Sequence, residues 1–114
     1  MDLAIRKAGK ACVLTLQGSV RADDNQQFED ALKDGRLRET SGVVLDVTKL
    51  EYMNSRAIGM VMALWMELSG LGAKLLVVHP TPLVERLLKS VGMYNFVPVT
   101  ASVAEALKSI SEKG

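Results

Sequence analysis

The N-terminal part of the chain alternates apolar and polar residues with a period of two, which is typical of β-strands. Residues 10–17 place Cys12, Leu14 and Leu16 on one face of such a strand. Residues 3–7 have the length of a short edge strand, and an Ala-Gly pair between the two segments offers a turn. The two segments therefore predict a β-hairpin.

Three later segments are short and mostly apolar, and each predicts a strand. Residues 43–47 and 74–78 are nearly continuous apolar runs, as in strands that are buried on both faces. Residues 96–99 predict a last strand, and Pro98 favours an edge position for it. We expect residues 48–54 to form a connecting loop.

Four segments have the period and the end signals of helices. Two starts are marked by Thr81-Pro82 and by the capping-box pattern Ser102-x-x-Glu105. We expect the last two residues, Lys113 and Gly114, to fray. The predicted helices cover residues 23–37, 55–69, 82–91 and 103–110.

The predicted order of elements is ββαβαβαβα. Strands separated by helices imply parallel neighbours and right-handed crossovers. The 114 residues are therefore predicted to form one α/β domain over residues 1–114, with a small mixed sheet of four or five strands and about four helices packed on it.

Composition excludes several classes of protein. The net charge of +1 is scattered and only 4% of residues are aromatic, so a nucleic-acid partner is not expected. The N-terminus has no signal-peptide pattern, and no apolar run approaches the ~20 residues of a membrane span. We expect a cytoplasmic protein that does not insert into a membrane, and Cys12 as a buried thiol.

The chain carries no pattern that predicts an enzyme. His79, the sole histidine, precedes a proline and is interpreted as a polar loop residue. Gly70-Leu71-Gly72 lacks the Lys-Ser/Thr ending of a phosphate-binding loop. Asp23-Asp24 is typical of a helix start and not of a metal site. No catalysis, cofactor or metal is expected.

Ser55 is the residue on which a functional hypothesis can be based. It begins a predicted helix, and Asp46 lies near the carboxyl end of the strand before it, the edge where ligands usually meet open α/β sheets. One interpretation is a helix N-cap, whose removal costs ~1 kcal/mol. The other is phosphorylation, because a helix N-terminus favours the added negative charge.

The helix that follows Ser55 has no charged residue from Ala57 to Met66. A helix on the outside of a small sheet usually shows a polar outer face. Either a neighbouring helix covers the second side, or the stretch is an exposed apolar patch that binds a partner.

Together these segments resemble the STAS domain family, the anti-sigma factor antagonists and their relatives. Val43-Val44-Leu45-Asp46, a gap of eight residues and then Ser55-x-x-Ile58-Gly59 match the family pattern. The order of elements and Leu16-Gln17-Gly18 agree with it as well.

The resemblance implies that Ser55 is phosphorylated by a serine protein kinase that is also the anti-sigma factor. The unphosphorylated antagonist binds this partner, phosphorylation ends the binding, and a PP2C-type phosphatase restores it. The residues expected to contact the partner are Asn54, Arg56, Ile58, Gly59, Met60, Asp46 and Arg21.

The motif departs from the family at four positions. Asn54 replaces Asp, Arg56 replaces Ser, Ala57 replaces Gly, and Arg21 stands where an acidic residue is common. Arg56 either pairs with a phosphate on Ser55 or points to solvent or to a partner carboxylate. Two other functions stay open: a constitutive scaffold or assembly subunit that is never phosphorylated, and an accessory STAS subunit of a transporter.

Overall fold

The computed structural model describes residues 1–111 and begins with the predicted hairpin. β1 (Asp2–Ala8) pairs antiparallel with β2 (Ala11–Val20), and Gly9 takes a left-handed conformation at the turn, with φ of 62°. Cys12 is buried, as predicted. The expected fraying of Lys113 and Gly114 lies outside the described residues.

The five strands form one mixed sheet in the order β1-β2-β3-β4-β5, and every pair after the hairpin is parallel. This confirms the predicted fold class. The later elements of the sheet and its helices are β3 (Gly42–Met53), β4 (Lys74–Val78), β5 (Val99–Thr100), α1 (Asn25–Leu32), α2 (Ser55–Gly70), α3 (Pro82–Ser90) and α4 (Val103–Ser111).

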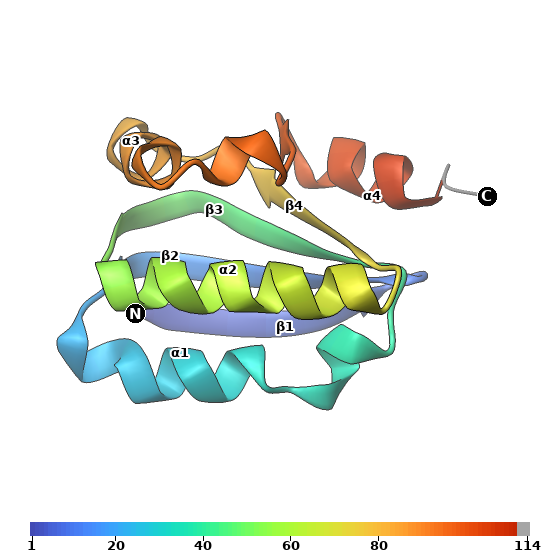
Figure 1. Cartoon of the computed structure of the whole chain (residues 1–114), viewed down its shortest axis with the longest axis horizontal. Coiled ribbons are helices and arrows are strands. Elements are labelled where there is room, and N and C mark those ends of the chain that lie inside the picture. The colour runs from blue at the N-terminus through green and yellow to red at the C-terminus, as the bar shows by residue number, and fades with distance from the viewer. Residues whose placement is uncertain (112–114) are drawn as a thin grey trace.

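The sheet has a hydrophobic core on each face. The larger core joins one face of the sheet to α1, α2 and α3, and it includes Phe28, Leu64 and Leu88. α4 packs on the opposite face, where Ala106 and Ile110 meet a smaller apolar cluster. In Figure 1 α1 and α2 run side by side along the sheet, and α4 lies on the far side of it.

The loop predicted for residues 48–54 is wrong, because β3 continues to Met53. β2 pairs with it along its length as far as Val20 and Met53, with two register shifts. β4 stops opposite Asp46, so this second half of β3 has a strand on one side alone. On the other side the Thr81 hydroxyl donates to the Leu50 carbonyl oxygen at 2.8 Å.

The helix predicted for residues 23–37 is also divided. A 3₁₀ turn at Ala22–Asp24 precedes α1, and a second one follows at Gly35–Arg38. Asp34 is the N-cap of the second turn, and its carboxylate accepts a hydrogen bond from the Arg36 backbone N–H at 2.9 Å. The break keeps Leu37 in the core and directs Arg38 toward α2.

The strand predicted for residues 96–99 is longer than the observed strand and begins too early in the chain. β5 contains Val99 and Thr100 alone, and Pro98 stands just before it. Met93–Asn95 form a 3₁₀ turn that leads directly into residues 96–98, so the apolar side chain of Val97 fills the core without joining the sheet.

Candidate functional site

Asn54, and not Ser55, is the N-cap of α2. Its backbone is extended, and its side-chain Oδ1 accepts a hydrogen bond from the Ala57 N–H at 2.8 Å. The N-cap interpretation of Ser55 is therefore wrong. Asn and Ser are equally good caps, so two such residues in a row leave the exact start of a helix ambiguous in the sequence.

Ser55 is the first residue of α2, and its side chain is exposed. Among residues 1–111 its hydroxyl makes no hydrogen bond. The N–H groups in the first turn of a helix have no acceptor within the helix. Asn54 occupies the N–H of Ala57, which leaves those of Ser55 and Arg56 facing outward. The Ser55 hydroxyl therefore has no hydrogen-bond partner among the described residues, and it lies next to two backbone N–H groups that also have none.

The two residues that flank Ser55 both contact α1. The Asn54 side-chain Nδ2 donates to Asn25 Oδ1 at 2.9 Å. Arg56 Nη2 lies 3.7 Å from Glu29 Oε1. Asn25 and Glu29 are four residues apart and therefore share one face of α1. We call these four residues, Asn25, Glu29, Asn54 and Arg56, the clasp.

The clasp changes the interpretation of Arg56. In the unmodified protein its guanidinium faces a carboxylate of the same chain, which neither of the two sequence-based alternatives included. Asn25 and Glu29 were not predicted as site residues. Their spacing was visible in the sequence, but nothing in it indicated that this face of α1 lies against the start of α2.

Arg21 lies beside the start of α2. Val20 is paired with Met53, and its carbonyl oxygen accepts a hydrogen bond from the Asn54 N–H at 3.1 Å. The exposed Arg21 guanidinium carbon lies 5.7 Å from the centre of the Tyr52 ring. The chain therefore places a second cation on the surface near the start of the helix.

Asp46 is not part of this site. It lies in the middle of β3, opposite Val78, and its carboxylate accepts hydrogen bonds from the backbone N–H and the hydroxyl of Thr48. Met53 is seven residues further along the strand, or about 23 Å at the rise of a β-strand. The prediction that Asp46 marks the end of the strand is wrong.

The outer side of α2 is a narrow uncharged strip. Ile58 is 4% exposed and belongs to the core, so the structure does not place it on the surface as a contact residue. Gly59 and Ala63 are exposed, and Met66 is 66% exposed. Neighbours half-bury Met60 and other flanking side chains, while this strip stays open, and its use for a partner stays a prediction. We call Gly59, Ala63 and Met66 the outer strip.

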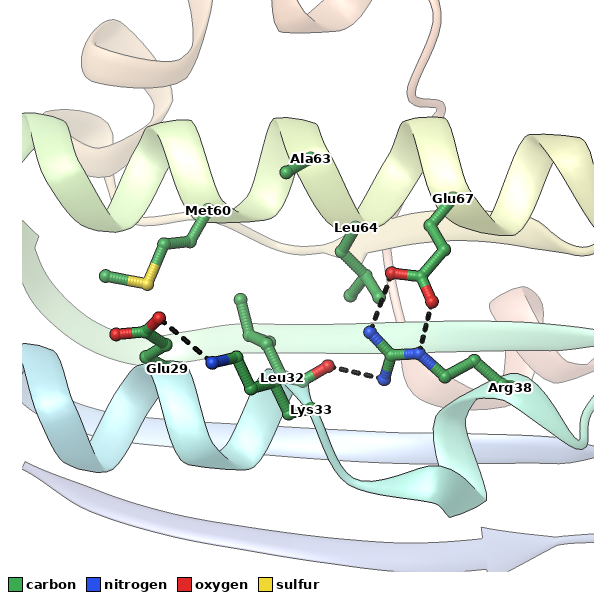
Figure 2. A pocket seen from close by; sticks show the side chains of 8 residues that line it. All are labelled: Glu29, Leu32, Lys33, Arg38, Met60, Ala63, Leu64 and Glu67. Atoms are coloured by element: carbon green, nitrogen blue, oxygen red, sulfur yellow. Dashed lines mark hydrogen bonds and ion pairs between the residues drawn. The ribbon is translucent and has the colours of Figure 1, made fainter.

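A groove of about 180 Å³ lies between α1 and α2. Figure 2 shows its apolar floor and the charged groups at its ends. Glu29 and Lys33 stand at the end near the clasp, with Lys33 Nζ 3.2 Å from Glu29 Oε2. Met60 of α2 lines the groove between this end and the first turn of the helix. The lining residues are Glu29, Leu32, Lys33, Arg38, Met60, Ala63, Leu64 and Glu67.

The far end of the groove is closed by a two-pronged ion pair. Arg38 Nε donates to Glu67 Oε2 at 2.6 Å, and Arg38 Nη2 donates to Glu67 Oε1 at 2.8 Å (Figure 2). Arg38 Nη1 also donates to the carbonyl oxygens of Leu32 and Asp34. The side-chain hydrogen bonds between Arg38 and Glu67 hold the pKa of Glu67 below its usual value and raise that of Arg38.

Within residues 1–111, no three His, Cys, Asp or Glu side chains are grouped so that they could hold a metal ion. None of the helices over these residues combines the length and the apolar character that crossing a bilayer requires.

The comparison with protein families identifies the fold. The family model described as the MlaB STAS domain matches residues 3–98. This chain belongs to the STAS domain family. The resemblance inferred from Ser55-x-x-Ile58-Gly59 is thereby confirmed. No curated protein matches the chain.

Solved structures agree with this assignment. A crystal structure of an anti-sigma factor antagonist from Mycobacterium paratuberculosis is similar with a TM-score of 0.86 and 16% identity, covering 96% of this STAS domain and 93% of that chain. The antagonist SpoIIAA in its unphosphorylated form has a TM-score of 0.85 and 15% identity, with 99% of both chains covered. SpoIIAA of Bacillus in its phosphorylated form has a TM-score of 0.75 and 15% identity, covering 96% and 99%. At these identities the likeness establishes the fold.

Proposed function

We propose that this STAS domain is a phosphorylation-switched antagonist. Its unphosphorylated form binds an anti-sigma factor that is also a serine protein kinase. The contact surface is the start of α2 together with the outer strip. Phosphorylation of Ser55 ends the binding, and a PP2C-type phosphatase restores it, so the domain regulates transcription without touching DNA.

The observation that carries this proposal is the exposed, unbonded hydroxyl of Ser55 at the first position of α2. In the transfer, the oxygen of Ser55 bonds to the γ-phosphorus of ATP, the bond to the ADP oxygen breaks, and the hydroxyl proton leaves to the kinase. The phosphate gives Ser55 a charge of roughly −1.5 to −2 at neutral pH. The unused N–H groups and the dipole at this end of the helix stabilise that charge, so the domain stays folded.

The composition of the adjoining surface explains how a phosphate would end the binding. Gly59 lies one turn beyond Ser55, and Ala63 and Met66 continue along the same side. A partner that covers this strip removes it from water. A phosphate at its end would then have to lose much of its hydration, which is costly for a group of that charge.

The direct test measures binding of the purified kinase to Ser55→Ala and Ser55→Asp by calorimetry. We expect the Ala variant to bind like the native chain and the Asp variant to lose at least tenfold in affinity, or about 1.4 kcal/mol. Ser102→Asp is the matched control, because Ser102 is an exposed serine at the start of α4, on the opposite face. Equal affinities of the Ala and Asp variants would refute the switch.

A constitutive binding subunit is the second candidate, with the transporter accessory subunit as one form of it. One observation favours it: the clasp engages both neighbours of Ser55 in the unmodified chain. Intact mass after incubation with the cognate kinase and ATP separates the two candidates. An unmodified chain would support the second one, as would co-purification with a membrane complex for the transporter form.

A further inference from the structure

The clasp gives Ser55 a neighbour that can respond to a phosphate. Arg56 follows Ser55 directly, and its side chain is 67% exposed. Its one carboxylate contact in the described chain is Glu29, at 3.7 Å. Charge-assisted N–H···O bonds are usually about 2.7–2.9 Å long. Arg56 is therefore held loosely in the unmodified domain.

Glu29 has a second ion-pair partner besides Arg56. Its other carboxylate oxygen lies 3.2 Å from Lys33 Nζ, one turn further along α1. If Arg56 moves away, Lys33 still faces Glu29. The cost of separating Arg56 from Glu29 is therefore small, since exposed ion pairs contribute little.

A phosphate on Ser55 is a stronger acceptor than Glu29. It carries more charge than a carboxylate and has three oxygens, and guanidinium groups bind phosphates through two parallel hydrogen bonds. Side chains in a helix tilt toward its N-terminus, so the long side chain of Arg56 can reach back over the first turn. The N–H groups of Ser55 and Arg56 face the same space.

We infer that Arg56 exchanges Glu29 for the phosphate on Ser55, so that phosphorylation opens one half of the clasp. This inference rests on the proposed phosphorylation of Ser55 and adds the residue that binds the phosphate. Asn54 keeps its hydrogen bond to Asn25, so α1 stays attached to the start of α2 at that end. Glu29, at the mouth of the groove, then faces Lys33 alone, while α1 stays packed on the core through Phe28 and Leu32.

The test uses the full chain with phosphoserine genetically encoded at position 55, so it requires no kinase. Phosphorus NMR follows the second ionisation of the phosphate, which falls near pH ~6 in a free phosphoserine. We expect Arg56→Gln to move the titration midpoint upward by about 0.5 pH unit, because an adjacent cation favours the doubly charged form. Arg86→Gln, which removes an exposed cation from α3, should leave the midpoint in place.

A double-mutant cycle shows whether Glu29 competes for Arg56. Glu29→Gln should move the midpoint downward while Arg56 is present, and by less in the Arg56→Gln background. Asp30→Asn removes the same charge from α1 without touching the clasp, and it measures the through-space part of the effect.

Two results would overturn the inference. The midpoint could respond to Arg21→Gln and not to Arg56→Gln, or Glu29→Gln could act equally in both backgrounds. Each result is independent of the kinase. If both titrations come out as expected but no kinase modifies Ser55, the inference holds and the proposed function fails.

Discussion

Both ends of α2 are joined to the α1 side of the molecule by an Arg–Glu ion pair, but the two pairs are built differently. At the C-terminal end, Arg38 and Glu67 meet through two short hydrogen bonds, and the guanidinium also binds two backbone carbonyl oxygens. At the N-terminal end, Arg56 and Glu29 approach at one contact of 3.7 Å. The same two residue types thus form a tight pair and a loose one.

The difference indicates which of the two ion pairs can break without unfolding the domain. The Arg38 side chain is 23% exposed, and removing it would take away the side-chain donor of the Leu32 carbonyl oxygen at the end of α1. Among residues 1–111 the Arg56 guanidinium donates to no backbone carbonyl oxygen, so its movement breaks no such hydrogen bond. The loose pair lies next to Ser55, the residue that we propose is modified, whereas the tight pair lies at the opposite end of the helix.

The largest effect on stability should come from Arg38→Ala. We expect a loss of about 1–3 kcal/mol in the free energy of unfolding, because hydrogen bonds to two carbonyl oxygens are lost together with the ion pair. Urea denaturation followed by circular dichroism measures it. Arg36→Ala is the control, since Arg36 pairs locally with Asp34, and its loss should be clearly smaller.

A smaller effect should appear as a dependence of stability on pH. Arg38 lowers the pKa of Glu67 in the folded protein, so this carboxylate stabilises the fold above its unfolded pKa, near 4.5. The contribution is lost as the pH falls through the lower, folded value. The stability difference between the native chain and Glu67→Gln should therefore be constant above pH 4.5 and shrink below it. A constant difference at all pH values would contradict the tight pairing.

The smallest effect should come from Arg56→Gln in the unmodified domain. Since exposed ion pairs are weak, we expect the free energy of unfolding to change by less than about 0.5 kcal/mol. The same denaturation experiment measures it. A loss as large as that of Arg38→Ala would show that the pair at Glu29 is a structural tie, and it would remove the contrast between the two ends.

The fold was largely predictable because its signals are local. The hairpin, the buried strand before Ser55 and the helix from Ser55 all follow from the periods of apolar residues and from turn and cap residues. The errors lie where partners distant in sequence decide. β3 runs on to Met53 because β2 pairs with it and Thr81 covers its other edge, and neither contact is visible in the segment itself.

The candidate site was predictable in its centre and not in its surroundings. Ser55 was recognised from its position and motif, but the choice between Ser55 and Asn54 as the N-cap depends on the backbone angles of one residue. Asn25 and Glu29 were missed because the sequence does not specify which face of α1 turns toward α2. Packing on the sheet determines that rotation.

The class of the fold, a helix after β3 and the absence of charge from Ala57 to Met66 follow from the order of amino acids, because each depends on neighbours along the chain. Tertiary packing decides which arginine is held tightly and which loosely. Arg38 and Arg56 are the same residue type, and they differ in how many fixed acceptors the packing of α1 against α2 brings within reach.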